Sequence, residues 1–71
     1  MNTDTIGQNA GSVWAALNEA QALGTKQLKK NAKLKNDREL YAALGWLARE
    51  GKIMFSTDEE SNELMISLVQ E

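Results

Sequence analysis

Apolar residues recur every three or four positions in three stretches of this 71-residue chain, and they alternate with polar ones in two later stretches. The first pattern predicts helices and the second predicts strands. In the earliest stretch, residues 6–20, one helix face would collect Ile6, Ala10, Val13, Trp14 and Leu17, and we expect Trp14 in the core. Thr5 and Gln8 have the spacing of a capping box, so we expect Thr5 to begin this helix.

The pattern over residues 25–34 predicts a short second helix and a tight turn. Thr25 is a suitable N-cap, and Leu28 and Ala32 are spaced to face inward from the same side of the helix. Leu34 is expected to close the turn. Ahead of this helix, Leu23 is expected to contribute a very short strand that pairs with a later hairpin.

A third, longer helix is predicted from Asn36 to Glu50. Asn36 and Glu39 have the spacing of a second capping box, and Gly51 supplies the left-handed residue that ends the helix. Its inward face would hold Leu40, Ala43, Leu44 and Leu47. The opposite face would hold Arg38, Ala42, Gly45 and Arg49, bordered by Tyr41 and Trp46. This outer face is cationic at both ends, small in the middle and aromatic at its borders.

Two strands are predicted at Lys52–Ser56 and Leu64–Val69, because both are rich in Ile, Met, Phe and Val. In the first, Ile53 and Phe55 would share one face. The loop between the strands is polar and anionic. The expected fold class is therefore α+β, a single domain over residues 1–71 in which three helices are followed by a two-stranded antiparallel hairpin.

Charge is unevenly distributed along the chain, although the net charge is only −2. Residues 25–38 contain six cations and one anion, whereas residues 50–71 contain six anions and one cation. The helix-turn-helix is thus basic and the hairpin acidic, which is informative about partners.

Composition argues against several classes of function. The chain has no Cys and no His, so it has no disulfide and no ordinary structural zinc site. The carboxylates of residues 57–63 do not have the spacing of a calcium loop, and we expect no metal and no cofactor. No catalytic motif is present, so we expect no enzyme and find no evident small-molecule ligand. The N-terminus does not resemble a signal peptide and no segment is apolar enough to span a membrane, so we expect a cytoplasmic protein.

Two segments carry a family resemblance: IGQNAGSVWAALN at Ile6–Asn18 and ALGWLAREGKI at Ala43–Ile53. With the order of helices and hairpin, they resemble the winged helix-turn-helix superfamily. More narrowly, they are similar to a family of short bacterial winged helix proteins of unknown function. The resemblance implies a binding module, since many winged helices bind DNA and others mediate protein contacts.

If the DNA-binding pattern of the superfamily applies, the third helix would enter the major groove of double-stranded DNA and the second would contact phosphates. The candidate DNA-binding residues are Lys26, Lys29, Lys30, Lys33, Lys35, Asn36, Arg38, Tyr41 and Ala42. Arg38 is the best candidate to read guanine. The acidic hairpin loop would be repelled by phosphates, so contact would come from the two helices alone, in a role related to transcription.

The alternative is a protein-interaction module that associates with itself as a homodimer. Its candidate residues are Tyr41, Gly45, Trp46 and Arg49. The basic helix-turn-helix of one copy would then meet the acidic hairpin of another. Trp46 is expected to pack on the hairpin of its own chain, which leaves Tyr41 as the better external contact.

Overall fold

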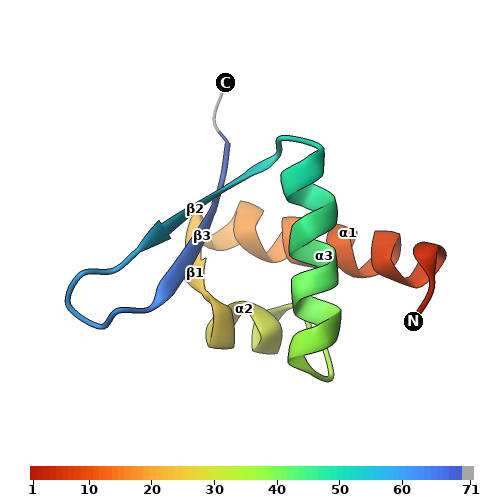
Figure 1. Cartoon of the computed structure of the whole chain (residues 1–71), viewed down its shortest axis with the longest axis horizontal. Coiled ribbons are helices and arrows are strands. Elements are labelled where there is room, and N and C mark those ends of the chain that lie inside the picture. The colour runs from red at the N-terminus through yellow and green to blue at the C-terminus, as the bar shows by residue number, and fades with distance from the viewer. Residues whose placement is uncertain (70–71) are drawn as a thin grey trace.

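Three helices pack on one face of a three-stranded antiparallel sheet in the computed structural model, which describes residues 1–69 (Figure 1). The elements are α1 (Thr3–Ala20), β1 (Ala22–Gly24), α2 (Thr25–Asn31), α3 (Asp37–Arg49), β2 (Ile53–Thr57) and β3 (Leu64–Leu68). The predicted α+β fold of three helices followed by a hairpin is confirmed.

The first helix begins earlier than predicted. Its N-cap is Asn2, whose Oδ1 accepts hydrogen bonds from the backbone N–H and the hydroxyl of Thr5, both at 2.9 Å. Thr5 is therefore a residue of the first turn, and the capping box with Gln8 was wrong. Asn is among the strongest N-caps, and the Thr5 hydroxyl adds a second hydrogen bond to it.

The core lies between α1, α3 and the inner face of the sheet, with α2 closing one end. Its buried side chains are Ala10, Val13, Ala16, Leu17, Leu28, Ala32, Leu40, Ala43, Leu44, Leu47, Ile53 and Ile66. All four inward residues predicted for α3 are among them. The prediction for Trp14 was wrong, because this side chain is 42% exposed. The buried stripe of α1 runs through Ala10, Val13 and Leu17 and includes Ala16 rather than Trp14.

The second helix follows directly from the first strand. Gly24 is its N-cap, with extended backbone and no side-chain hydrogen bond, so Thr25 is the first helical residue and the predicted cap was wrong. Gly24 belongs to β1, where it pairs with Met65 of β3. Thr25 cannot be the N-cap because the strand runs without a break into the helix.

The third helix begins and ends nearly as predicted. The Asn36 side chain accepts a hydrogen bond from the Glu39 N–H at 2.9 Å, which confirms the cap. The Glu39 carboxylate, however, accepts from the Lys35 N–H at 2.9 Å rather than from Asn36. At the other end, Gly51 has a φ of +71°, and the Lys52 N–H donates to the Leu47 carbonyl. This is the left-handed helix end that glycine favours.

The sheet has the order β1-β3-β2, so β3 is its central strand. The short strand predicted near Leu23 is confirmed, with Leu23 opposite Ile66. Phe55 also lies opposite Ile66 and therefore on the inner face with Ile53, as predicted. It is nevertheless 47% exposed, because β2 is an edge strand that extends beyond the helices.

Candidate nucleic-acid interface

The turn between α2 and α3 is held by backbone and side-chain contacts. The Leu34 N–H donates to the Lys29 carbonyl at 3.0 Å and the Lys33 N–H donates to the Lys30 carbonyl at 3.1 Å. These two bonds form a Schellman motif, in which Lys33 takes the left-handed position with a φ of +60°. The orientation of α3 relative to α2 is thereby fixed by local geometry.

An ion pair joins the two helices across this turn. The Lys29 Nζ lies 2.8 Å from the Asp37 Oδ1 at the start of α3. Both side chains are solvent-accessible, so the pair contributes at most about 1 kcal/mol to stability. The positive charge of Lys29, a candidate DNA-binding residue, is therefore paired with the carboxylate of Asp37 in the same chain.

The other predicted cations of the turn divide into two groups. Successive residues of a helix are about 100° apart around its axis. Lys26 and Lys30, each two residues from buried Leu28, therefore lie on the opposite side of α2. Lys30 also lines a shallow hollow with Lys33 and with Glu19 of α1. Lys33, in the turn after α2, therefore lies beside α1.

Lys35 and Arg38 form the second group, at the start of α3, and both are exposed. Neither makes an ion pair with another residue in the described range 1–69. The two nearby carboxylates are engaged elsewhere, that of Asp37 with Lys29 and that of Glu39 with the Lys35 N–H. Both carboxylates at this end of α3 are thus held in local contacts.

The outer face of α3 carries no carboxylate. Following the helical repeat, its residues are Arg38, Tyr41, Ala42, Gly45 and Arg49, all exposed except Ala42, which is half-buried. Tyr41 is 52% exposed, and a Cβ at Gly45 would meet nothing within 4 Å. The face is open to solvent, with a cation at each end.

The side chain of Trp46, a residue of α3, packs against α1 and not against the hairpin, so the prediction for its packing was wrong. A Cβ added at Gly7 would lie 3.4 Å from a ring carbon of Trp46, which places the indole directly over that glycine. Both residues line a hollow of about 300 Å³ together with Gly11, Trp14 and Leu47. Of the two glycines of α1, Gly7 was the signal in the sequence that another element approaches this helix, whereas the position of Gly11 is open.

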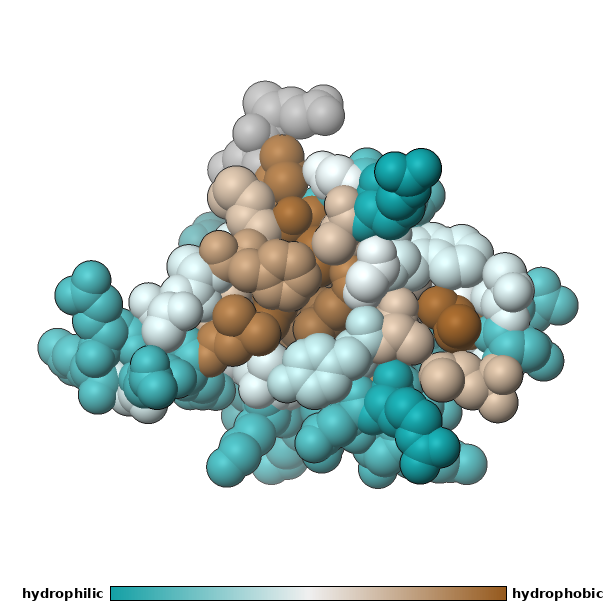
Figure 2. Space-filling model, viewed as in Figure 1, coloured by the Kyte–Doolittle hydropathy of each residue, from teal (hydrophilic) through white to brown (hydrophobic). Residues whose placement is uncertain are grey.

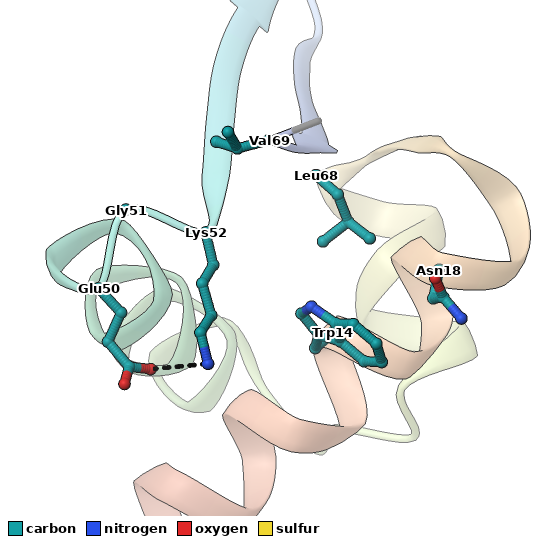
Figure 3. A pocket seen from close by; sticks show the side chains of 7 residues that line it. All are labelled: Trp14, Asn18, Glu50, Gly51, Lys52, Leu68 and Val69. Carbon is teal, nitrogen blue, oxygen red and sulfur yellow. Dashed lines mark ion pairs between the residues drawn. The ribbon is translucent and has the colours of Figure 1, made fainter. Parts of the chain in front are cut away.

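A second hollow, of about 680 Å³, lies beyond Trp14 at the base of the hairpin (Figure 3). Trp14 and Leu68 form one wall, and Glu50 and Lys52 lie opposite, with 3.9 Å between the Lys52 Nζ and the Glu50 Oε1. No group of three or more metal-ligating side chains occurs among residues 1–69. The hollow holds one amine and one carboxylate in contact with solvent, and this arrangement suggests no particular chemistry.

The acidic loop between β2 and β3 extends away from the helix-turn-helix (Figure 1). Its backbone is organised by Asp58, which accepts from the Glu60 N–H through its side chain and from the Asn62 N–H through its carbonyl. Figure 2 shows hydrophilic atoms at this loop and around the α2–α3 turn, with apolar atoms gathered over the middle of the face. Glu71, counted above with the acidic segment, lies outside the described residues.

Residues 1–68 match a family described as winged helix-turn-helix domain (DUF2582). The chain belongs to this family. This winged helix-turn-helix domain is also similar to the solution NMR structure of protein BT2368 from Bacteroides thetaiotaomicron, with 34% sequence identity and a TM-score of 0.81. That similarity covers 96% of this chain and 79% of the other. No functionally curated protein matches the sequence.

Winged helix domains are typically binding modules and not enzymes. Within residues 1–69 of this winged helix domain, no helix is both long enough and apolar enough to cross a membrane. The fold is shared by proteins with different partners, so the exposed faces of α2 and α3 are what indicate the partner of this domain.

Proposed function

We propose that this winged helix domain binds double-stranded DNA through α3 and the turn before it, as a transcription-related regulator in a bacterial cytoplasm. The observation that carries the proposal is the outer face of α3, which is open, lacks carboxylates and has cations at both ends. A helix that enters the major groove contacts base edges with its N-terminal residues. A face without carboxylates is not repelled by the phosphates on either side of the groove.

The residues of this surface would have different roles. Arg38, with its planar guanidinium group, would read guanine, and Tyr41 and Ala42 would make apolar contacts in the groove. Lys35 and Lys26 would contact phosphates. Lys30, which also lines the hollow beside α1, would reach only the edge of the surface.

Three candidate residues take revised roles in this proposal. Lys29 acts as a positioning residue, because its ammonium group holds Asp37 and hence the start of α3. The Asn36 side chain caps α3 and would not be free to contact a base. Lys33 lies beside α1, so we leave it outside the DNA surface.

A salt-dependent titration of short duplexes tests the proposal. The logarithm of the binding constant should fall linearly with the logarithm of the salt concentration. Lys35→Gln should weaken binding to all sequences alike and reduce the slope by about 1. Arg38→Gln should instead reduce discrimination between sequences.

Lys52→Gln is the matched control, because it removes the same charge at the base of the hairpin, beyond the end of α3 opposite to Lys35. It should leave both affinity and slope unchanged. If Lys35→Gln and Lys52→Gln weakened binding equally, only the net charge of the protein would matter. The absence of binding at low salt would refute the proposal directly.

A second candidate function is protein interaction through the same outer face. It is supported by Tyr41 and Trp46, which are 52% and 36% exposed on either side of the open position Gly45. Arg49 would lie at the rim of such a contact. Exposed aromatic side chains beside an Arg are typical of protein interfaces. Concentration-dependent shifts of the Tyr41 and Trp46 ring signals without DNA would favour this candidate.

A further inference from the structure

The second strand has an open edge. In the order β1-β3-β2 it pairs only with β3, and four of its five residues are exposed. Natural edge strands are usually protected from further pairing by Lys, Pro, a bulge or a covering segment. The sequence IMFST at 53–57 contains no charge and no proline, and it pairs with β3 in unbroken register. Among residues 1–69, no strand pairs with its outer edge.

The hydrogen-bond pattern shows which backbone groups this edge presents. The Val69 N–H donates to the Lys52 carbonyl, and the Asp58 N–H donates to the Glu63 carbonyl, both at 2.9 Å. In an antiparallel pair, every second residue points its N–H and C=O toward the partner strand. The backbone N–H and C=O groups that point toward β3 are therefore those of Lys52, Met54, Ser56 and Asp58. The N–H and C=O groups of Ile53, Phe55 and Thr57 point outward.

We propose that a second copy of this chain pairs with β2, antiparallel and centred on Phe55, so that two sheets join into one of six strands. A two-fold axis through Phe55 places Ile53 opposite Thr57 of the other copy, and Phe55 opposite itself. Outward-facing groups then meet outward-facing groups at three pairs, each of which exchanges two backbone hydrogen bonds. Phe55, 47% exposed in one chain, would be covered by its counterpart.

Charge favours this register and opposes one of its two neighbours. With the axis at Phe55, Lys52 lies opposite Asp58 of the other copy, and symmetry produces this pair twice. A shift in one direction brings Asp58 opposite Glu50, which places like charges together. A shift in the other direction brings Asp58 opposite Met54 and Lys52 opposite Glu60. It keeps an attractive pair but extends the pairing into the turn residues after Asp58.

Lys52 is able to take part because its side chain is only loosely held. Its Nζ lies 3.9 Å from the Glu50 carboxylate, at the outer limit of an ion pair, and the side chain is 53% exposed. The interface of one strand is smaller than that of a standard stable complex, so we expect a weak dimer that forms as concentration rises. The proposal does not rest on DNA binding.

Sedimentation of the full chain without nucleic acid tests the pairing by charge exchange. Lys52→Glu and Asp58→Lys each turn two attractive pairs into repulsive ones, and each should raise the dimer dissociation constant about tenfold. An equimolar mixture of the two variants restores both attractive pairs, so it should form a heterodimer at about the wild-type strength. Glu59→Lys is the matched control, since it makes the same charge change at the next residue and should alter the constant by less than about twofold.

A backbone variant tests the edge itself. Thr57→Pro removes an N–H that points away from β3, so the hairpin should stay folded while the dimer is lost. Circular dichroism checks the fold, and if this variant unfolds, the charge exchange decides alone. A wild-type chain that stays monomeric at millimolar concentration overturns the proposal. So does a dimer that survives Thr57→Pro, because the second copy would then occupy another surface, or a mixture that fails to restore pairing.

Discussion

Gly11 allows a test of whether α1 is a continuous helix. Gly11 lies in the middle of α1 on its exposed side, and a Cβ at this position would meet nothing within 4 Å. Replacing glycine by alanine in an exposed helix interior reduces the backbone entropy lost on folding by about 1 kcal/mol. We therefore expect Gly11→Ala to stabilise the domain by about 1 kcal/mol, which corresponds to a rise of about 4–8 °C in Tm for a chain of this size.

Two other glycines provide the comparison. Gly45→Ala, in the middle of α3 and equally open, should raise Tm by a similar amount. Gly51→Ala should lower stability by about 1 kcal/mol, because a φ of +71° strains any side chain with a Cβ. Urea and thermal denaturation measured on all three variants would check the series. If Gly11→Ala failed to stabilise while Gly45→Ala did, α1 would not be a continuous helix at that point, and the reasoning would be refuted.

Three further changes test contacts that were found only in the structure. Asn2→Ala should cost about 1 kcal/mol in denaturation experiments, since it removes the cap of α1, and a loss no larger than that of Thr5→Ala would contradict this. Trp46→Ala should cost about 2 kcal/mol, less than a fully buried indole, and thermal unfolding with the remaining tryptophan as probe would measure it. Lys29→Met should cost less than about 1 kcal/mol at low salt, and the loss should shrink as salt rises, whereas the same loss at all salt concentrations would argue against the pair with Asp37.

The sequence predicted α3 well and α1 less well, for reasons that lie in their patterns. Helix α3 has a strong N-cap in Asn36, inward residues at regular spacing and a glycine stop, and all three signals agree. Helix α1 has a weaker pattern because glycines and alanines fill much of its surface. Its periodicity could not show whether Ala16 or Trp14 lies at the buried edge, since that depends on how the other helices and the sheet pack against α1.

The sequence predicted which residues belong to the candidate site but not how their side chains are arranged. The cations between residues 25 and 38 were evident from the sequence, yet their directions depend on a short helix and on the left-handed backbone at Lys33. The ion pair between Lys29 and Asp37 spans a turn and has no helical spacing to reveal it. The contact of Trp46 with Gly7 joins residues far apart in the chain, and only tertiary packing could place them together.

The position of β3 at the centre of the sheet also determines how the domain can assemble. Both of its neighbours, β1 and β2, precede it in the chain, and neither pairs with the other. During synthesis on a ribosome, all three helices emerge before any part of the sheet can form. Until β3 emerges, both outer strands lack a partner, and closure of the sheet joins Leu23 to Ile66 from opposite halves of the chain. Such non-local pairing is slow compared with helix formation, so we expect sheet closure to limit the folding rate.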